Sequence, residues 1–332
     1  TNPAPLAVRL VDWMNDPDLT RRFMASAGAV LQFLLTAMAL LVWLALERLG
    51  GVATKRLAAS GRRYGKDRAA RLAAGSAMML AAGLVLAGLG VLAIWSFAGY
   101  WAFPDALPSS WTMETWSRHL NAVGGPLAAT IKIGLIATLI AVIVTLACLE
   151  RETRLGNGGG SRALGILYLP LLVPQPAFLF GLQMLFLAAG LNGWFWAVVM
   201  VHLVFVLPYV FLSLSDPWRA LDGRYAKLAA SLGAPVNRIF WRIRLPMLLR
   251  AILAAAAIGF AVSIGQYLPT LLIGAGRWPT LTTEAVGLAS GGDRRVIGVY
   301  AFLQMALPFA GFLVATLVPA LLFARRKGMK IG

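Results

Sequence analysis

The chain contains seven apolar stretches, each long enough to cross a lipid bilayer as a helix. The first, residues 24–46, has no charged side chain, and its 23 residues rise about 34 Å against a hydrocarbon core of about 30 Å. The predicted spans are residues 24–46, 76–98, 126–149, 163–187, 194–214, 248–272 and 298–323. With 59% hydrophobic and only 13% charged residues, the chain is predicted to be an all-α polytopic membrane bundle of about seven transmembrane helices.

The distribution of basic residues predicts how the chain is oriented. Residues 50–72 hold a cluster of Lys and Arg against the single acid Asp67, which by the positive-inside rule places this loop in the cytoplasm. The same rule places the N-terminus of this chain in the periplasm and the basic C-terminal tail in the cytoplasm. On this topology most of the 30 Lys and Arg residues lie inside, but only about half of the 13 Asp and Glu residues. The cluster and tail comprise Lys55, Arg56, Arg62, Arg63, Lys66, Arg68, Arg71, Arg325, Arg326, Lys327 and Lys330.

Several function classes find no support in the sequence. The net charge of +17 follows the spans, so we expect no nucleic-acid partner. Cys148 is the only cysteine and is predicted to be buried. His119 and His202 are the only histidines, and His119 has no partner His or Cys at metal-binding spacing. The chain has no phosphate-binding G-x-x-x-x-G-K-[ST] motif and no catalytic constellation, so we expect no catalytic residues, metal or cofactor.

Residues 221–246 form a basic island between two apolar spans, yet their pattern indicates ordered helices. Asp222 is placed to cap a first helix, and Gly233 to end it in a left-handed turn. Pro235 suits the first turn of a second helix, and Leu245-Pro246 is predicted to break the chain again. The first helix has an apolar stripe of Tyr225, Leu228, Ala229 and Leu232, and the second has one of Val236, Ile239, Phe240 and Ile243.

The spacing within this island resembles the cytoplasmic EAA loop of the permease subunits of binding-protein-dependent ABC importers. That loop reads Glu-Ala-Ala, three residues, Gly, nine residues, Ile, one residue, Leu-Pro. Here Ala229 is followed after three residues by Gly233, and Ile243-Arg244-Leu245-Pro246 completes the register nine residues later. The chain departs from the family only at the front, where Lys227 and Leu228 replace the Glu and the first Ala.

The resemblance implies a role and a set of partners. In the family this loop is a coupling helix that sits in a groove of a separate ATPase, which works as a dimer, while a periplasmic binding protein delivers the substrate. The chain would then be a multi-pass protein of the bacterial inner membrane that does not itself hydrolyse ATP. The residues implied to couple to the ATPase are Tyr225, Lys227, Leu228, Ala229, Leu232, Gly233, Ile243, Leu245 and Pro246.

The resemblance also suggests a domain organisation. It runs from about residue 76 to the C-terminus and is closest to the fused two-half permeases of the ferric-iron, thiamine and Ynj type. A weak repeat relates residues 18–32 to residues 293–304, each an Asp and an Arg pair that lead into a span. We therefore expect residues 1–48 to end a preceding permease half, residues 49–75 to be a basic cytoplasmic linker, and residues 76–332 to form a six-span permease domain. The missing first half, or a second permease, and membrane lipid would be further partners.

Polar residues inside the spans are candidates for the transport pathway. Intramembrane polar groups often mark such pathways, although they also form interhelical hydrogen bonds worth about 0.6 kcal/mol each. The candidates are Gln183, Gln266, Tyr267 and Gln304. Two local features are also predicted: Ser110 caps a short outer helix that contains Trp116, and Pro170, Pro174 and Pro176 bend the fourth span.

Three other interpretations of the island and the spans remain open. The two basic amphipathic helices of residues 221–246 are also typical of segments that lie on anionic lipid. A secondary transporter would need intramembrane ionisable residues for ion coupling, of which the spans hold almost none. A membrane scaffold that transports nothing would not need the fixed distance between Gly233 and Pro246.

Overall fold

The computed structural model describes residues 5–16, 18–61, 68–101, 105–156, 161–289, 291 and 293–323. Within these residues every regular element is a helix, and Ala98 and Trp111 form one isolated antiparallel bridge. The predicted all-α membrane bundle is thereby confirmed. The predicted cytoplasmic residues Arg62, Arg63, Lys66 and Asp67 and the basic tail from Arg325 to Lys330 lie outside the described residues.

The chain divides into two compact units. The first comprises the residues up to Trp95 together with Leu172–Gly181. It contains α1 (Leu6–Asn15), α2 (Leu19–Ala59), almost all of α3 (Arg68–Phe97) and the first half of α6 (Gln175–Ala188). Helix α1 packs against α2 where Gly28 leaves room for the fully buried side chain of Leu10.

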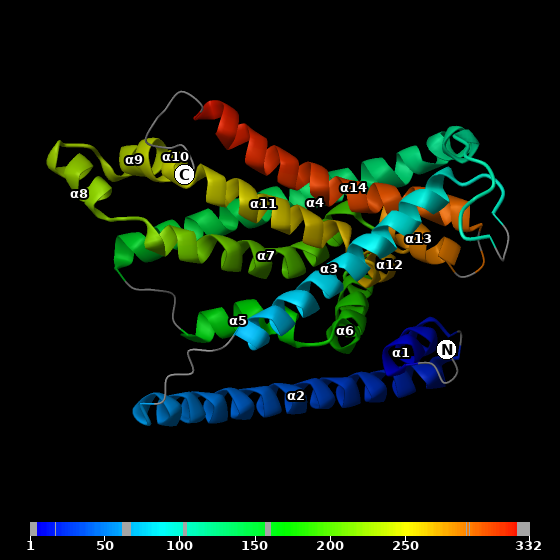
Figure 1. The fold of residues 1–332 in the computed structure, drawn as a ribbon, viewed down its shortest axis with the longest axis horizontal. Coiled ribbons are helices and arrows are strands. Elements are labelled where there is room, and N and C mark those ends of the chain that lie inside the picture. The colour runs from blue at the N-terminus through cyan, green and yellow to red at the C-terminus, as the bar shows by residue number, and fades with distance from the viewer. Residues whose placement is uncertain are drawn as a thin grey trace. The chain divides into compact units, whose positions relative to one another are not determined.

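The second unit, Ser96–Leu171 and Leu182 onward, contains the rest of the chain. Its long helices α4 (Glu114–Leu155), α7 (Phe195–Ala220), α11 (Leu249–Ile264) and α14 (Arg294–Leu322) pack along one another (Figure 1). The shorter elements are α5 (Ser161–Leu172), α8 (Arg224–Ser231), α9 (Val236–Ile239), the π-helical turn η1 (Phe240–Arg244), α10 (Leu245–Met247), α12 (Leu268–Gly274) and α13 (Leu281–Ala289).

Five helices of the described chain are long and apolar enough to cross a membrane, namely α2, α3, α4, α7 and α14. A sixth span results if the segment Val236–Met247 is counted with Leu249–Ile264, to which it is bent by 71°. The predicted fourth span is interrupted between α5 and α6, where Pro174 separates two shorter apolar helices. The predicted sixth span, residues 248–272, is likewise broken between α11 and α12.

The core of the second unit depends on small residues that let helices approach closely. A Cβ atom at Gly259 of α11 would lie 2.6 Å from Val210 Cγ2 of α7, and one at Gly134 of α4 would lie 2.8 Å from the Phe260 ring. Ala255, also on α11, is fully buried. Small residues on α4 and α11 thus let these helices and α7 approach closely.

Two local predictions, the cap at Ser110 and the burial of Cys148, are wrong. Ser110 caps no outer helix, because its hydroxyl accepts a hydrogen bond from the Tyr100 amide and the amide of Glu114 donates to Thr112 instead. Trp116 therefore belongs to α4, which continues unbroken through the third span to Leu155. Cys148 is exposed, not buried. Helices α2 and α3 extend into both ends of the predicted linker, residues 49–75.

Candidate functional site

The island of residues 221–246 folds as the helix, glycine and helix that its sequence predicts. The Asp222 carboxylate accepts a hydrogen bond of 2.9 Å from the Arg224 amide at the start of α8. Gly233 ends the first helix with a φ of 79°, in the left-handed region that favours glycine. Pro235 precedes the first residue of α9. We call α8, α9, η1 and α10 together the elbow.

The second half of the elbow differs in detail from its prediction. Residues 240–244 form a π-helical turn, and Pro246 lies in the first turn of α10, where its missing amide hydrogen costs nothing. The sharp bend comes two residues later, at Leu248, which separates α10 from α11. The chain therefore turns just after the Leu245-Pro246 pair, not at it.

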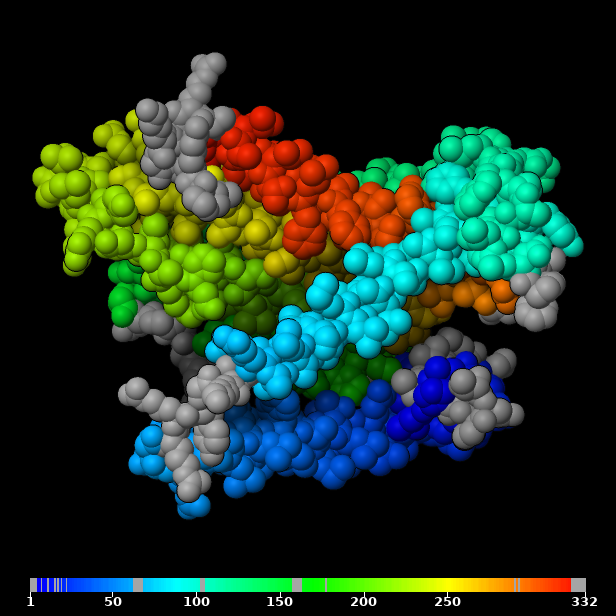
Figure 2. All heavy atoms as spheres, in the orientation of Figure 1, coloured from blue at the N-terminus to red at the C-terminus, as the bar shows by residue number. Residues whose placement is uncertain are grey.

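The apolar stripe of α8 faces away from the protein. Tyr225, Leu228 and Leu232 are 52%, 63% and 80% exposed, whereas Ala229 is half-buried. Lys227 is also exposed. A surface helix normally turns such a stripe toward its own core, so an outward stripe indicates a surface that another molecule covers. In the space-filling view α8 protrudes from one end of the second unit (Figure 2).

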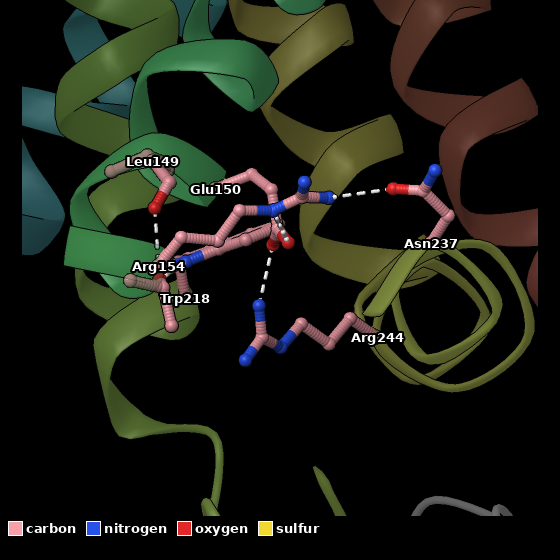
Figure 3. A network of polar contacts seen from close by, with 7 residues as sticks. Leu149, Glu150, Arg154, Trp218, Asn237 and Arg244 are labelled. Carbon is pink, nitrogen blue, oxygen red and sulfur yellow. Dashed lines mark hydrogen bonds and ion pairs between the residues drawn. The ribbon is translucent and has the colours of Figure 1, made fainter. Parts of the chain in front are cut away.

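A buried carboxylate attaches the elbow to the end of α4 (Figure 3). The side chain of Glu150 is only 8% exposed, and its Oε1 accepts a bond of 2.7 Å from Arg154 Nε of the same helix. Its Oε2 accepts a bond of 2.5 Å from Arg244 Nη1 of the elbow. Arg154 also donates through Nη2 to Asn237 Oδ1 of α9 at 3.1 Å. Glu150 thus attaches two elements of the elbow to α4: it binds η1 directly through Arg244, and it positions Arg154, which binds α9 through Asn237.

The end of α7 is tied to the same turn of α4. The indole of Trp218 donates to Thr153 Oγ1 at 2.9 Å, and this hydroxyl donates to the Leu149 carbonyl. The centroid of the Trp218 ring lies 6.4 Å from the centroid of the Phe240 ring in the elbow. The ends of α4 and α7 thus both contact the second half of the elbow, at the same end of the unit (Figure 1).

The structure separates the four pathway candidates. Gln183 Nε2 of α6 donates to the Leu272 carbonyl of α12 at 3.2 Å, which is the interhelical hydrogen bond that the alternative interpretation expects. Gln266 is buried and Tyr267 half-buried at the break before α12. Gln304 is half-buried on α14. Three candidates thus lie in or against the broken sixth span, and the fourth lies on another helix.

His202 of α7 has a structural role that the sequence did not lead us to predict. It is 1% exposed, and its Nδ1 and Nε2 each lie 2.8 Å from a hydroxyl oxygen, of Ser263 and Thr270 respectively. Because Thr270 Oγ1 donates its hydrogen to the Gln266 carbonyl, it must accept from Nε2–H, so Nδ1 accepts from Ser263. This hydrogen-bond chain joins α7 to both sides of the break in the sixth span. A histidine within a predicted span is the signal that would have identified it.

The opposite end of the second unit has a polar cleft of about 390 Å³ that contains His119. Asp293 lines it, and the hydrogen bonds from Arg295 hold the pKa of this carboxyl below its usual value. In the described part of the chain, no three His, Cys, Asp or Glu side chains come together as a metal site would require.

Comparison with known proteins gives one family and several relatives. Residues 157–328 match the family described as "Binding-protein-dependent transport system inner membrane component". The match begins before α5 and covers the elbow, the broken sixth span and α14.

The relatives are permease proteins of transport systems. The chain is 39% identical over 201 residues to the inner membrane ABC transporter permease protein YnjC of Escherichia coli (strain K12), over 60% of this chain and 38% of that protein. It is 22% identical over 183 residues to the spermidine/putrescine transport system permease protein PotC of Haemophilus influenzae, over 55% and 70%. It is 25% identical over 190 residues to the putative 2-aminoethylphosphonate transport system permease protein PhnV of Salmonella typhimurium, over 56% and 72%. The match thus spans well under half of the E. coli relative.

Proposed function

Because the chain belongs to the family of binding-protein-dependent transport system inner membrane components, we propose that it forms a membrane-spanning part of an ATP-driven importer. In this proposal a separate ATPase dimer binds the elbow, and conformational changes of the dimer are passed through the elbow to the membrane helices. A periplasmic binding protein supplies the substrate at the other face. The elbow and the ends of α4 and α7 then face the cytoplasm, the orientation that the basic loops predict.

One observation carries this proposal: the elbow is an ordered, outward-facing apolar surface that is rigidly attached to the bundle. Tyr225, Leu228 and Leu232 offer contact area to a partner, while Glu150 holds the elbow to α4. Coupling to a partner needs both the exposed contact surface and the attachment to α4. A partner can shift a conformational equilibrium only if it binds the two conformations with different affinity, and the attachment carries that difference to the membrane helices. A helix that merely rests on lipid needs no buried ion pair at its base.

We further propose that the chain is the later part of a duplicated permease. Residues 1–48 would end a first half, residues 49–75 would link the halves, and residues 76–332 would form the second half. The short coverage of the E. coli relative leaves room for such a first half. Its loss would remove one of two elbows, so the importer is expected to need the longer protein or a second permease.

The proposal is tested with the full-length permease, its ATPase and its binding protein in lipid vesicles. Leu228→Asp places a charge in the exposed stripe and should weaken binding of the ATPase at least tenfold and abolish transport-linked ATP hydrolysis. The thermal stability of the membrane domain should not change, because Leu228 is 63% exposed. The measurements are co-purification of the ATPase and ATP turnover that depends on the binding protein.

Ala230→Asp is the matched control, since Ala230 is exposed on the same helix but outside the stripe. It should retain most of the coupled ATP hydrolysis. If Leu228→Asp leaves both ATPase binding and transport intact, the elbow is not the site that couples the chain to an ATPase. A scaffold or a secondary transporter then becomes the better interpretation. Transport that continues without ATP but follows an imposed ion gradient would favour the secondary transporter.

A further inference from the structure

An apolar groove of about 760 Å³ runs along the outer face of α4 and beneath the elbow. One wall is formed by side chains of α4, and the other by α9, η1 and the first residue of α10. Its lining includes Leu139, Val142, Ile143, Leu146, Phe240 and Trp241. Ile143 is more than half exposed and Trp241 is 67% exposed, so apolar side chains here face out of the second unit.

The end of the groove beneath the elbow is positively charged. Arg151 and Arg154 line it, three residues apart and therefore on one side of α4. The Glu150 carboxylate is the acid at this end, and it is already shared between Arg154 and Arg244. Two arginines thus line this end of the groove beside one carboxylate that is already shared with Arg244, which leaves an excess of positive charge at the mouth.

Both arginines at the mouth have hydrogen-bond donors to spare. Arg151 is exposed and makes no hydrogen bond or ion pair with the described residues. Arg154 uses Nε for Glu150 and one Nη2 hydrogen for Asn237, whereas a guanidinium carries five N–H donors. Arginine presents these donors in the geometry that a phosphate oxygen pair accepts. The mouth is therefore complementary to a phosphodiester.

The length of the groove fits one leaflet of a bilayer. Leu139 and Arg151 are twelve residues apart on a continuous helix, which is about 18 Å. One leaflet contributes about 15 Å of hydrocarbon, half of a core of about 30 Å. An acyl chain lying along α4 would thus reach from the middle of the membrane to the arginines. Trp241 also lines the groove, and tryptophan is enriched where membrane proteins meet the headgroup region.

We propose that this groove binds an anionic glycerophospholipid, with an acyl chain along α4 and the phosphodiester between Arg151 and Arg154. A free phosphate would account for the arginines but not for the apolar walls. A neutral, zwitterionic lipid would account for the walls but not for the excess charge. The bound headgroup would lie beside the ion pairs of Glu150, which attach the elbow to α4.

The test uses the purified chain in neutral detergent and phospholipids with bromine atoms on the acyl chains. Bromine quenches tryptophan fluorescence only at contact, and subtraction of the Trp241→Phe variant isolates the signal of Trp241. Brominated phosphatidylglycerol should quench this signal saturably and at a much lower concentration than brominated phosphatidylcholine. Arg151→Gln should raise the phosphatidylglycerol concentration at half-quenching about fivefold. Ala147→Phe, which fills the groove, should abolish the quenching.

Two substitutions on α4 outside the groove serve as matched controls. Arg118→Gln removes an exposed arginine at the opposite end of the helix, and Ala128→Phe enlarges an exposed alanine. Both should bind phosphatidylglycerol as the parent chain does, and all variants should keep the parent's thermal unfolding transition. A variant that unfolds is replaced by Arg151→Lys or Ala147→Leu, each with a smaller effect of the same sign.

Three results would overturn the proposal. Equal quenching by the two lipids would mean that the arginines select no headgroup. Displacement of phosphatidylglycerol by inorganic phosphate at the same concentration would mean a site for a free anion. Failure of either lipid to quench Trp241 would mean that protein, such as a second copy or another permease half, covers the groove.

Discussion

At the scale of single residues, two buried polar groups do most to fix the geometry of the second unit. Glu150 joins α4 to the elbow, and His202 joins α7 to both sides of the broken sixth span. Each is stable in its position because its polar atoms have partners, since an unpaired buried polar group costs about 1–3 kcal/mol and a buried charge more. Substitution of either residue is therefore expected to lower the stability of the protein by an amount that can be measured.

Glu150→Gln should destabilise the protein by about 3–5 kcal/mol, because it leaves Arg244, with a side chain only 16% exposed, without its counter-charge. Unfolding by denaturant, followed by circular dichroism, measures the loss. Glu152→Gln is the control: its ion pair with Arg219 is longer, at 3.3 Å, and the arginine is half exposed, so the expected loss is only about 0–1 kcal/mol. Equal losses for the two variants would show that Glu150 does not hold the elbow.

His202→Phe should destabilise the protein by about 1 kcal/mol, because it removes two hydrogen bonds of the size found between membrane helices. Ser263→Ala removes one of the same bonds. The double variant should therefore lose less stability than the two single losses added together. His119→Phe, at the polar cleft, is the control and should show no such coupling to Ser263→Ala. Strict additivity of His202→Phe and Ser263→Ala would contradict the hydrogen-bond chain.

At the scale of elements, α11 is the helix that the others pack around. It contacts α4, α7 and α14, and its small residues set how closely they approach. Phe260 of α11 lies over Gly134 on one side, and Gly259 lies against Val210 on another. The break after α11 and the bend before it then place the elbow at one end and Gln266 at the other. Packing of one helix thus positions both candidate regions.

Gly259→Ala should destabilise this packing by about 1–3 kcal/mol. The added Cβ would lie 2.6 Å from Val210 and 3.1 Å from Val206, and a buried valine in a helix has essentially one rotamer, so it cannot swing away. Val210→Ala should restore part of the loss in the double variant. Gly125→Ala in α4 is the control, because its Cβ meets nothing within 4 Å, and it should be neutral or stabilising. Thermal unfolding in detergent compares the four proteins.

At the scale of the whole molecule, the second unit combines a packed helical bundle with the exposed apolar stripe of α8, the surface that the proposed ATPase would bind. The second unit has its apolar core, its elbow and its lipid groove within one compact body. Two permease halves, each with an elbow, would give the two subunits of an ATPase dimer one equivalent binding site each. This is the physical reason why the proposed function includes a second permease half.

Much of the elbow was predictable from the sequence because its signals are local. The left-handed turn at Gly233, the hydrogen bond that Asp222 accepts before α8 and the stripe of α8 depend only on neighbouring residues. The stripe did not reveal that it faces outward, since periodicity gives a helix two faces but not which one is buried. The predicted cap at Ser110 is wrong because a distant part of the chain binds its hydroxyl, which accepts a hydrogen bond from the Tyr100 amide. Thr112, which lies nearer the start of α4, accepts the bond from the Glu114 amide instead.

Local signals are enough to predict a bundle of membrane helices and the approximate bounds of the basic elbow, because hydrophobic length, charge and turn residues act over short distances. The contacts that hold the elbow in place could not be predicted in this way, because they join residues far apart in the chain. Glu150 and Arg244 are 94 residues apart, and His202 and Thr270 are 68 apart. Such pairs form only when packed helices bring distant residues together, and a buried charge gains its stability from the partner that it meets there.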